Sequence, residues 1–195
     1  FGRTGKWFGI DHYGVTPDIM VMAKGLTSGY VPLSAVVVSE PIAKFFDDHV
    51  LSCGLTYSGH PIGCAAALAN IEVYEEEGLI ENSKRMGQVL KNHMLRMKEL
   101  HPSVGDVRSI GLFGVIECVK NRATKEPTAP YNAKASEMGA MTQVGAKLKD
   151  LGMHTFVRWN WIFVAPPLCI NESQLKDGFA MIDQALALTD AAMNR

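Results

Sequence analysis

The sequence predicts an α/β protein in two parts, and three observations along its 195 residues support this. Two apolar runs of strand length, residues 19–23 and 33–38, lie close together and are bounded by proline and glycine. Two long helical patterns follow at residues 61–77 and 80–100. A second strand-like stretch at residues 107–119 then precedes two further helical segments.

Composition and charge argue against several classes of protein. The hydrophobic share of 47% and the charged share of 20% are ordinary for a globular protein. A net charge of -1 gives no electrostatic reason to bind nucleic acid or an anionic membrane. No apolar run reaches about 18 residues, and the N-terminus lacks a charged region followed by an apolar stretch, so we expect neither a membrane span nor a signal peptide. Cys53, Cys64, Cys118 and Cys169 match no metal-binding spacing, so we expect no metal and buried free thiols in a reducing cytoplasm.

The first predicted strand ends in a lysine. Residues 19–23 are apolar without a break, as in strands covered on both faces, and Lys24 and Gly25 follow them. A buried lysine readily becomes a neutral amine, and a neutral amine can form a Schiff base with a carbonyl. Gly25 would let the backbone turn and a flat cofactor approach. Spacing alone favours a plainer alternative, in which the lysine stem carries its charge to solvent.

The segments up to residue 77 predict a bend, a strand and two helices. The short link between residues 19–23 and 33–38 predicts antiparallel neighbours. Ser39 is the expected cap of a short helix that ends near Asp47. Pro61 suits the first position of the long helix, whose free N–H groups would suit a phosphate. We expect His60, just before it, to be a structural histidine satisfied by local contacts.

A domain boundary is predicted between residues 78 and 79, giving parts 1–78 and 79–195. In the second part Arg108, on the stretch 107–119, is expected to form a surface or interdomain ion pair. Helices are predicted at residues 80–100, at 133–151 and, beginning at an Asn171 cap, at the C-terminus, and a polar loop at 121–132.

Five short motifs, in order, resemble the class III (omega) aminotransferases, which use pyridoxal phosphate (PLP). They are residues 1–6 (Phe-Gly-Arg-Thr-Gly-Lys), 17–19 (Pro-Asp-Ile), 23–26 (Ala-Lys-Gly-Leu), 32–35 (Pro-Leu-Ser-Ala) and 56–61 (Thr-Tyr-Ser-Gly-His-Pro). The resemblance covers nearly the whole chain and implies a fold-type I PLP transferase. It implies that residues 1–78 are the C-terminal portion of the PLP-binding large domain and 79–195 a small α+β domain. It further implies that Lys24 holds PLP covalently and that Thr56 contacts the PLP phosphate of the neighbouring subunit.

A sixth motif, residues 165–168 (Ala-Pro-Pro-Leu), adds to the resemblance. Many family members carry an arginine shortly before it that grips the substrate carboxylate, which implies substrate-binding roles for Arg158 and the adjacent Trp159. The usual glycine-aspartate pair is absent and the spacing is shorter, so an exposed arginine flanked by packing tryptophans stays the alternative. The run at residues 155–161 looks closest to taurine–pyruvate and related omega-amino acid transaminases.

The resemblance implies transamination of an omega-amino acid or amine, of the β-alanine, 4-aminobutyrate or taurine class, to a keto acid such as pyruvate. It also implies a cytoplasmic homodimer or higher oligomer. Family members are longer and resemble this chain in their second half, so we expect a C-terminal half that is inactive without its N-terminal half. Two alternatives stay open: another PLP reaction, such as decarboxylation or an internal amino shift, and a non-catalytic assembly piece.

Overall fold

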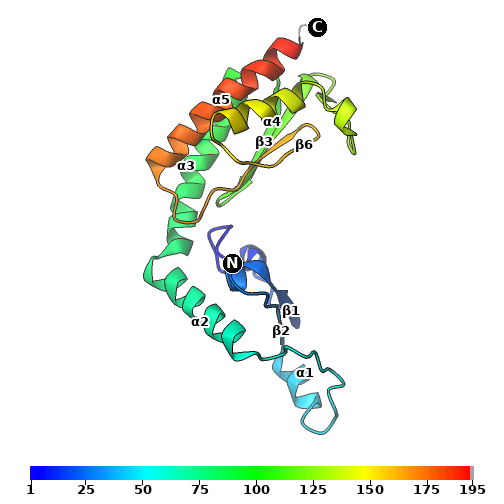
Figure 1. Cartoon of the computed structure of the whole chain (residues 1–195), viewed down its shortest axis with the longest axis vertical. Coiled ribbons are helices and arrows are strands. Elements are labelled where there is room, and N and C mark those ends of the chain that lie inside the picture. The colour runs from blue at the N-terminus through cyan, green and yellow to red at the C-terminus, as the bar shows by residue number, and fades with distance from the viewer. Residues whose placement is uncertain (194–195) are drawn as a thin grey trace. The chain divides into compact units, whose positions relative to one another are not determined.

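The computed structural model describes residues 1–193 and forms two compact units (Figure 1). The first unit comprises Phe1–Gly2 and Lys6–Ile80, and the second comprises Arg3–Gly5 and Glu81–Arg195. The assignment of residues 1–78 to a large domain and 79–195 to a small one stays a prediction.

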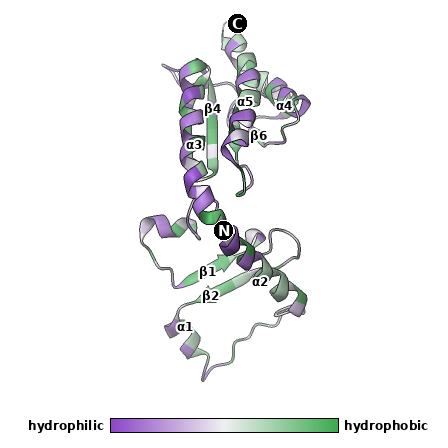
Figure 2. Cartoon of the chain, turned by 90° about the vertical axis from the view of Figure 1, so that its left-hand side faces the viewer, coloured by the Kyte–Doolittle hydropathy of each residue, from purple (hydrophilic) through white to green (hydrophobic). Residues whose placement is uncertain are grey.

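A two-stranded antiparallel sheet organises the first unit. Strand β1 (Ile19–Met22) pairs with β2 (Ala35–Val38), which places Ile19 opposite Val38 and confirms the predicted antiparallel pairing. The expectation that β1 is buried on both faces is wrong for this chain, because Ile19 is 57% exposed and Val21 is 73% exposed. Both strands are largely green, the colour of hydrophobic residues, in Figure 2. Among the described residues no third strand extends this sheet. Its faces also expose apolar side chains in β2, where Val36 is 64% exposed and Val37 is 50% exposed.

Short helical turns η1 (Gly9–Tyr13) and η2 (Lys24–Leu26) flank β1, and two α-helices follow the sheet. Helix α2 (Pro61–Glu76) begins at the predicted proline, and His60 Nδ1 accepts from Ile62 N at 3.3 Å, as expected of a locally satisfied histidine. Helix α1 (Glu40–Phe45) does follow Ser39, but the predicted side-chain cap is wrong. Ser39 Oγ is buried and without a partner in the described chain, while its backbone N–H donates to Asp18 O at 2.8 Å. That bond holds Ser39 to the end of the β1–β2 ladder.

The second unit is built on an antiparallel sheet of five strands in the order β3-β4-β7-β6, with β5 beside β4. Their bounds are β3 (Val104–Ile110), β4 (Phe113–Asn121), β5 (Glu126–Pro127), β6 (Val157–Arg158) and β7 (Trp161–Val164). The predicted strand stretch is thus a hairpin whose turn includes Gly111 at φ 54°. A Cβ on Gly114 of β4 would lie 2.6 Å from Met94 Sδ, which shows how closely a helix packs on this strand.

Three helices complete the second unit. Helices α3 (Leu79–Leu100) and α5 (Glu172–Met193) match the predictions, and Asn171 caps α5, because Gln174 N donates to Asn171 Oδ1 at 2.9 Å. The helix predicted at 133–151 is shorter, since α4 (Ala140–Asp150) begins after Gly139, whose φ of 52° ends the preceding turn, η3 (Ala135–Glu137). Side chains from all three helices and from the sheet form the core of the unit, and they are almost inaccessible to solvent: Leu90, Met94, Val104, Ile116, Val144, Ile162 and Leu186.

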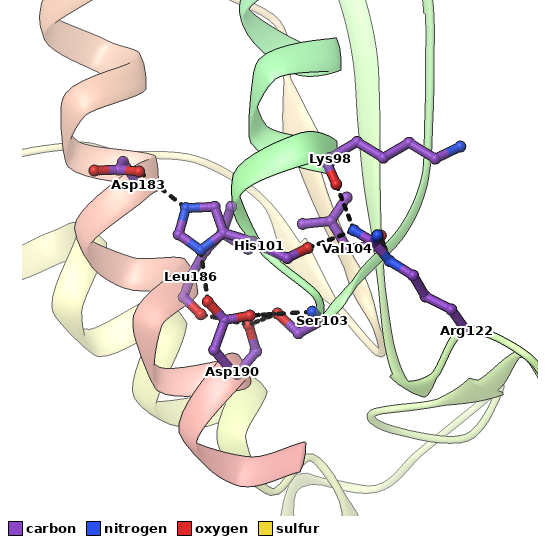
Figure 3. Close-up of polar contacts among 9 residues, drawn as sticks. Lys98, His101, Ser103, Val104, Arg122, Asp183, Leu186 and Asp190 are labelled. Atoms are coloured by element: carbon purple, nitrogen blue, oxygen red, sulfur yellow. Dashed lines mark hydrogen bonds and ion pairs between the residues drawn. The ribbon is translucent and has the colours of Figure 1, made fainter. Parts of the chain in front are cut away.

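Polar side chains tie the end of α3 to α5 (Figure 3). His101 is 7% exposed, with Nδ1 2.7 Å from Asp190 Oδ2 and Nε2 2.9 Å from Asp183 Oδ1. Each ring nitrogen of His101 therefore lies against a carboxylate oxygen of α5, a hydrogen-bond acceptor. Ser103 donates to the same Asp190 carboxylate from its N–H at 3.0 Å and its hydroxyl at 2.6 Å. We call His101, Asp183, Asp190 and Ser103 the histidine clamp.

Arg122 completes the C-terminus of α3. Its guanidinium donates to the carbonyls of Lys98, of His101 at 2.6 Å and of Val104 at 3.0 Å (Figure 3). The last carbonyls of a helix have no partner within the helix and carry partial negative charge, so an arginine there is favourable. No helix in the described part of the chain is long and apolar enough to cross a membrane.

Candidate active site

Lys24 lies just beyond β1, where the backbone leaves the strand for the turn η2. Its φ of 50° is uncommon for a residue other than glycine, and such strain is often found at functional sites. The side chain is exposed rather than buried as the sequence suggested, and no described residue bonds to its amine. An amine held at a strained turn without a partner is available to react with a carbonyl.

Asn70 on α2 holds this turn in place, a contact that the sequence did not predict. Its side-chain amide donates to Gly25 O at 2.9 Å and Leu26 O at 3.1 Å, and its Oδ1 accepts from Ser28 Oγ at 2.6 Å. Both carbonyls follow Lys24 directly, so Asn70 fixes the backbone that sets the direction of the lysine. The sequence offered one sign of such a role. Asn70 is a weak helix former that stands at the end of an alanine-rich helical stretch, and it has no obvious partner nearby in the sequence.

Gly25 is crowded by a neighbouring ring. A Cβ at this position would lie 3.3 Å from Phe1 Cβ, which is tighter than most such contacts. Phe1 is itself packed edge-on against Phe8, with ring centroids 5.4 Å apart, and against Tyr74 at 6.4 Å. A larger residue here would have to push Phe1 aside by a few tenths of an ångström, so the glycine eases packing within the first unit, whatever it contributes to cofactor approach.

Thr56 lies in the turn that leads into α2. The turn is closed by Ser58 N donating to Leu55 O at 2.9 Å, and Gly59 follows with φ 67°. Thr56 is exposed, and no described residue hydrogen-bonds to its hydroxyl. The structure thus places Thr56 and Lys24 in the same unit, each with a polar group free to bind a ligand, and no direct contact between their side chains is present in the described chain.

Arg158 and Trp159 lie at the tip of the hairpin formed by β6 and β7 in the second unit. The loop of this hairpin is Trp159 and Asn160, and the φ of 53° at Trp159 is a true outlier for so bulky a residue. Asn160 anchors the tip to β4, since its Nδ2 donates to Cys118 O at 3.1 Å and its own carbonyl accepts from Cys118 N at 2.7 Å. The strained tip is thereby held firmly on the sheet.

The Arg158 guanidinium stacks on the indole of Trp159. Its Cζ lies 4.3 Å from the Trp159 ring centroid and 6.0 Å from that of Phe156, which is a cation–π arrangement. Within the described residues no carboxylate pairs with Arg158, and the residue is exposed. An oriented, unpaired guanidinium is suited to a planar anion, which it can bind through two parallel N–H groups. Packing by tryptophans alone would give the same contacts, so the substrate role stays a prediction.

Arg108, in contrast, is fully occupied by ion pairs with two carboxylates at the surface of the sheet. It donates to Asp106 Oδ2 at 2.7 Å and to Glu117 Oε2 at 2.8 Å, and Lys98 Nζ lies 2.9 Å from Asp106 Oδ1. Hydrogen bonds from Lys98 lower the pKa of Asp106, and those to Glu117 raise the pKa of Arg108. The predicted surface ion pair is confirmed.

The cysteines correct another expectation. Cys118 is buried, and burial raises the pKa of its thiol to about 12, but Cys53, Cys64 and Cys169 are exposed. Cys53 and Cys64 lie in the loop 48–60 and at the start of α2, which the described residues leave uncovered, and Cys169 lies in the exposed turn before α5. In the part of the chain that the structure describes, no group of His, Cys, Asp or Glu could hold a metal ion.

Comparison with known proteins gives one consistent family. The family model for aminotransferase class-III matches residues 1–186. Taurine–pyruvate aminotransferase of Bilophila wadsworthia is 40% identical over 195 residues, which cover 97% of this chain and 42% of that protein. Putrescine–pyruvate aminotransferase of Pseudomonas aeruginosa is 36% identical, over 99% of this chain and 41% of that protein.

A solved structure agrees in both fold and sequence. The taurine:2-oxoglutarate aminotransferase of Bifidobacterium kashiwanohense, in complex with PLP and glutamate, superposes with a TM-score of 0.92 at 45% identity. The match covers 99% of this chain and 43% of that one. The chain therefore spans about two-fifths of the length of the proteins that it matches.

Proposed function

The chain belongs to the class-III aminotransferases, and from this premise we propose that it is the C-terminal part of a PLP-dependent enzyme that transfers an amino group from an omega-amino acid or amine to a keto acid. The observation that carries the proposal is Lys24, an unpaired amine at a strained turn inside the matched segment. It supports a fold-type I enzyme, the fold of the PLP-bound neighbour.

The free polar groups of the first unit fit PLP. The cofactor offers an aldehyde and a phosphate, and Lys24 Nζ and the Thr56 hydroxyl are an amine and a hydrogen-bond donor suited to these two groups. When bound, PLP supplies an electron sink for the carbon that carries the donor nitrogen. Once the donor amine has displaced it from the cofactor, Lys24 Nζ would be free to take the proton from that carbon and to give it back as a general acid. Asn70 keeps the amine in place through the carbonyls of Gly25 and Leu26.

Thr56 is proposed to bind the phosphate of the cofactor in a second subunit. The supporting observation is its free, exposed hydroxyl in the turn that leads into α2, whose N-terminal N–H groups favour an anion. The active enzyme is accordingly a homodimer or higher oligomer. Each active site then combines Lys24 of one subunit with Thr56 of the other.

Arg158 is proposed to select donors that carry an anionic group at a short distance from the amine. Its guanidinium is unpaired and oriented by Trp159, which supports recognition of a carboxylate or a sulfonate. Donors of this kind are β-alanine, 4-aminobutyrate and taurine. Pyruvate is the proposed acceptor, following the taurine–pyruvate relative, and 2-oxoglutarate is a second candidate favoured by the structural neighbour.

The test uses the complete enzyme that contains this chain. Borohydride reduction of the PLP-loaded enzyme should fix the cofactor to the peptide that contains Lys24, and Lys24→Ala should lose nearly all turnover while still binding PLP without a covalent bond. Alanine formed from pyruvate, without release of CO₂, separates transamination from decarboxylation. Labelling of another lysine would overturn the assignment.

A subunit-mixing control tests the shared site. In a mixed dimer of Lys24→Ala and Thr56→Ala subunits, one site carries both substitutions and the other carries neither. At limiting PLP we expect mixing to restore activity that neither variant has alone. If Thr56 serves its own subunit, both sites of the mixed dimer carry one substitution and mixing restores nothing.

A further inference from the structure

A surface hollow in the second unit lies beside the bulge that interrupts β3 between Val104 and Asp106. Its volume is about 520 Å³, which is the size of a site for a small organic molecule. Four of its eight lining residues are cationic and two are acidic, so its charge is net positive. We call it the basic hollow, and its lining residues are Lys98, Gly105, Asp106, Arg108, Glu117, Val119, Arg122 and Lys125.

The two carboxylates of the basic hollow are already occupied. Asp106 accepts from Lys98 Nζ at 2.9 Å and, with its other oxygen, from Arg108 at 2.7 Å. Glu117 Oε2 accepts from Arg108 at 2.8 Å. Each carboxylate therefore has a cationic partner on the lining, and the excess positive charge comes from the remaining two cations.

These two cations, Arg122 and Lys125, have no acidic partner in the part of the chain that the structure describes. Arg122 Nε and Nη2 donate to carbonyls at and after the end of α3 (Figure 3), while no described residue accepts from Nη1. The Lys125 amine has neither a hydrogen bond nor an ion pair within residues 1–193. Two unpaired cations that line one hollow favour the binding of an anion there.

The backbone at Lys125 is an independent reason to assign its side chain a role. Its φ of 59° lies in the left-handed region, which asparagine or glycine adopts at less cost than lysine. The turn is held by another side chain, because Asn121 Oδ1 accepts from Ala123 N at 2.8 Å and from Thr124 N at 3.2 Å. None of these bonds requires a lysine at position 125, and strain of this kind is often found at ligand sites.

We propose that the basic hollow binds the phosphate group of a small molecule, with Arg122 Nη1 and the Lys125 amine as donors. Arginine binds phosphate through its planar guanidinium, and lysine binds it as a point charge. A phosphate monoester carries about −1.5 to −2 charges at pH 7, which matches two unpaired cations. The phosphate is either inorganic or carried by an organic molecule, for which the hollow has room. Such binding needs no part of the aminotransferase reaction, so either proposal can fail without the other.

Calorimetry on the complete, PLP-saturated enzyme tests the site, with inorganic phosphate and ribose 5-phosphate as probes and ribose as the neutral control. At constant ionic strength both phosphates should bind and ribose should not. Lys125→Asn removes the amine and suits a positive φ, so the variant should fold. It should weaken both phosphates about tenfold, the effect of one hydrogen bond to a charged group. Tighter binding of ribose 5-phosphate would identify an organic phosphate as the ligand, and equal binding would identify phosphate itself.

Lys120→Asn is the matched control, because it removes the same charge next to the same turn. Lys120 does not line the basic hollow, and its amine lies 2.9 Å from Glu126 Oε1. Its substitution should change phosphate binding by less than about twofold, as expected of an exposed charge without contact to the ligand. Equal weakening by the two substitutions would show diffuse attraction only and would overturn the proposal, as would a failure of both phosphates to bind.

Acetylation of lysine amines locates the bound anion directly. Inorganic phosphate should slow the acetylation of Lys125 severalfold and leave that of Lys120 unchanged, at constant ionic strength, as read by mass spectrometry. Protection of both amines alike, or of neither, would place the anion elsewhere and overturn the assignment of Lys125.

Discussion

The two units differ in how completely they bury their apolar residues. In the second unit α3, α4 and α5 enclose a core with members such as Leu90, Ile116 and Leu186 that are inaccessible to solvent. In the described first unit the buried apolar residues are Leu26, Ala67 and Tyr74, while β1 and β2 expose valines and isoleucine. An exposed apolar surface of this kind marks an interaction site. The difference indicates that the second unit has an enclosed core of its own, whereas the described residues leave the sheet of the unit bearing Lys24 uncovered.

Thiol reactivity should show the largest difference between the units. Burial, together with the nearby Asp190 and Glu117 carboxylates, raises the pKa of Cys118 from 9.0 to about 12. The thiolate is the reactive form, so at pH 8 we expect Cys118 to be alkylated about a thousandfold more slowly than Cys53 and Cys64. Iodoacetamide labelling of the 195-residue chain, read by mass spectrometry, measures this. All four thiols should react alike in urea; similar rates in the folded chain would contradict a closed core.

Valine truncation gives the next largest contrast, at two strand positions. Val104 in β3 is 0% exposed and Val21 in β1 is 73% exposed. Val104→Ala should lower the free energy of unfolding by about 2 kcal/mol, because it removes buried methyl groups and leaves a cavity. Val21→Ala should change it by less than about 0.5 kcal/mol. Urea unfolding followed by tryptophan fluorescence checks both, and a cost at Val21 as large as at Val104 would show that β1 is covered.

The smallest expected effect concerns the exposed Lys98–Asp106 ion pair of the second unit. Hydrogen bonds from Lys98 hold the pKa of Asp106 below its ordinary value of 3.8. A carboxyl group with a lowered pKa in the folded state adds stability above its unfolded pKa and loses it as pH falls through the folded value. Asp106 is 44% exposed, so Asp106→Asn should cost about 0.5 kcal/mol at pH 7.

The pH dependence is the sharper part of this test. The difference between Asp106→Asn and the unsubstituted chain should shrink below pH 3.8 and vanish at lower pH. Urea unfolding from pH 7 to pH 2.5 measures it. A difference that persists at the acid end would show that the substitution acts through packing rather than charge.

Local patterns were enough to predict many elements of the fold. Neighbouring residues alone predicted three features that the structure confirms. These are the end of the strand before Lys24, the proline that begins α2 and the Asn171 cap of α5. Burial of β1 was predicted wrongly, since an apolar strand does not reveal whether a covering layer is present. The later start of α4 depends on a positive φ at Gly139, which no periodicity indicates.

The sequence was enough to single out candidate site residues, but it did not predict the contacts that surround them. Lys24, Thr56, Arg158 and Trp159 stood out through motifs, and their roles stay predictions. The hydrogen bonds from Asn70 to the carbonyls of Gly25 and Leu26 span 45 and 44 positions in the sequence, so they depend on the tertiary fold. The contact between the Tyr131 and Trp159 rings likewise needs two loops to meet. Contacts of this kind have no periodic trace in a sequence.

The histidine clamp joins residues that are synthesised at widely separated times. His101 and Asp190 are 89 positions apart, and the second carboxylate, Asp183, is 82 positions away. A ribosome that adds roughly 5–20 residues per second needs on the order of 5–20 s to cover that distance. During this interval the apolar face of α3 has emerged without α5 to cover it. The clamp therefore closes only after α5 has been made, and until then the nascent chain exposes the surface that later becomes its core.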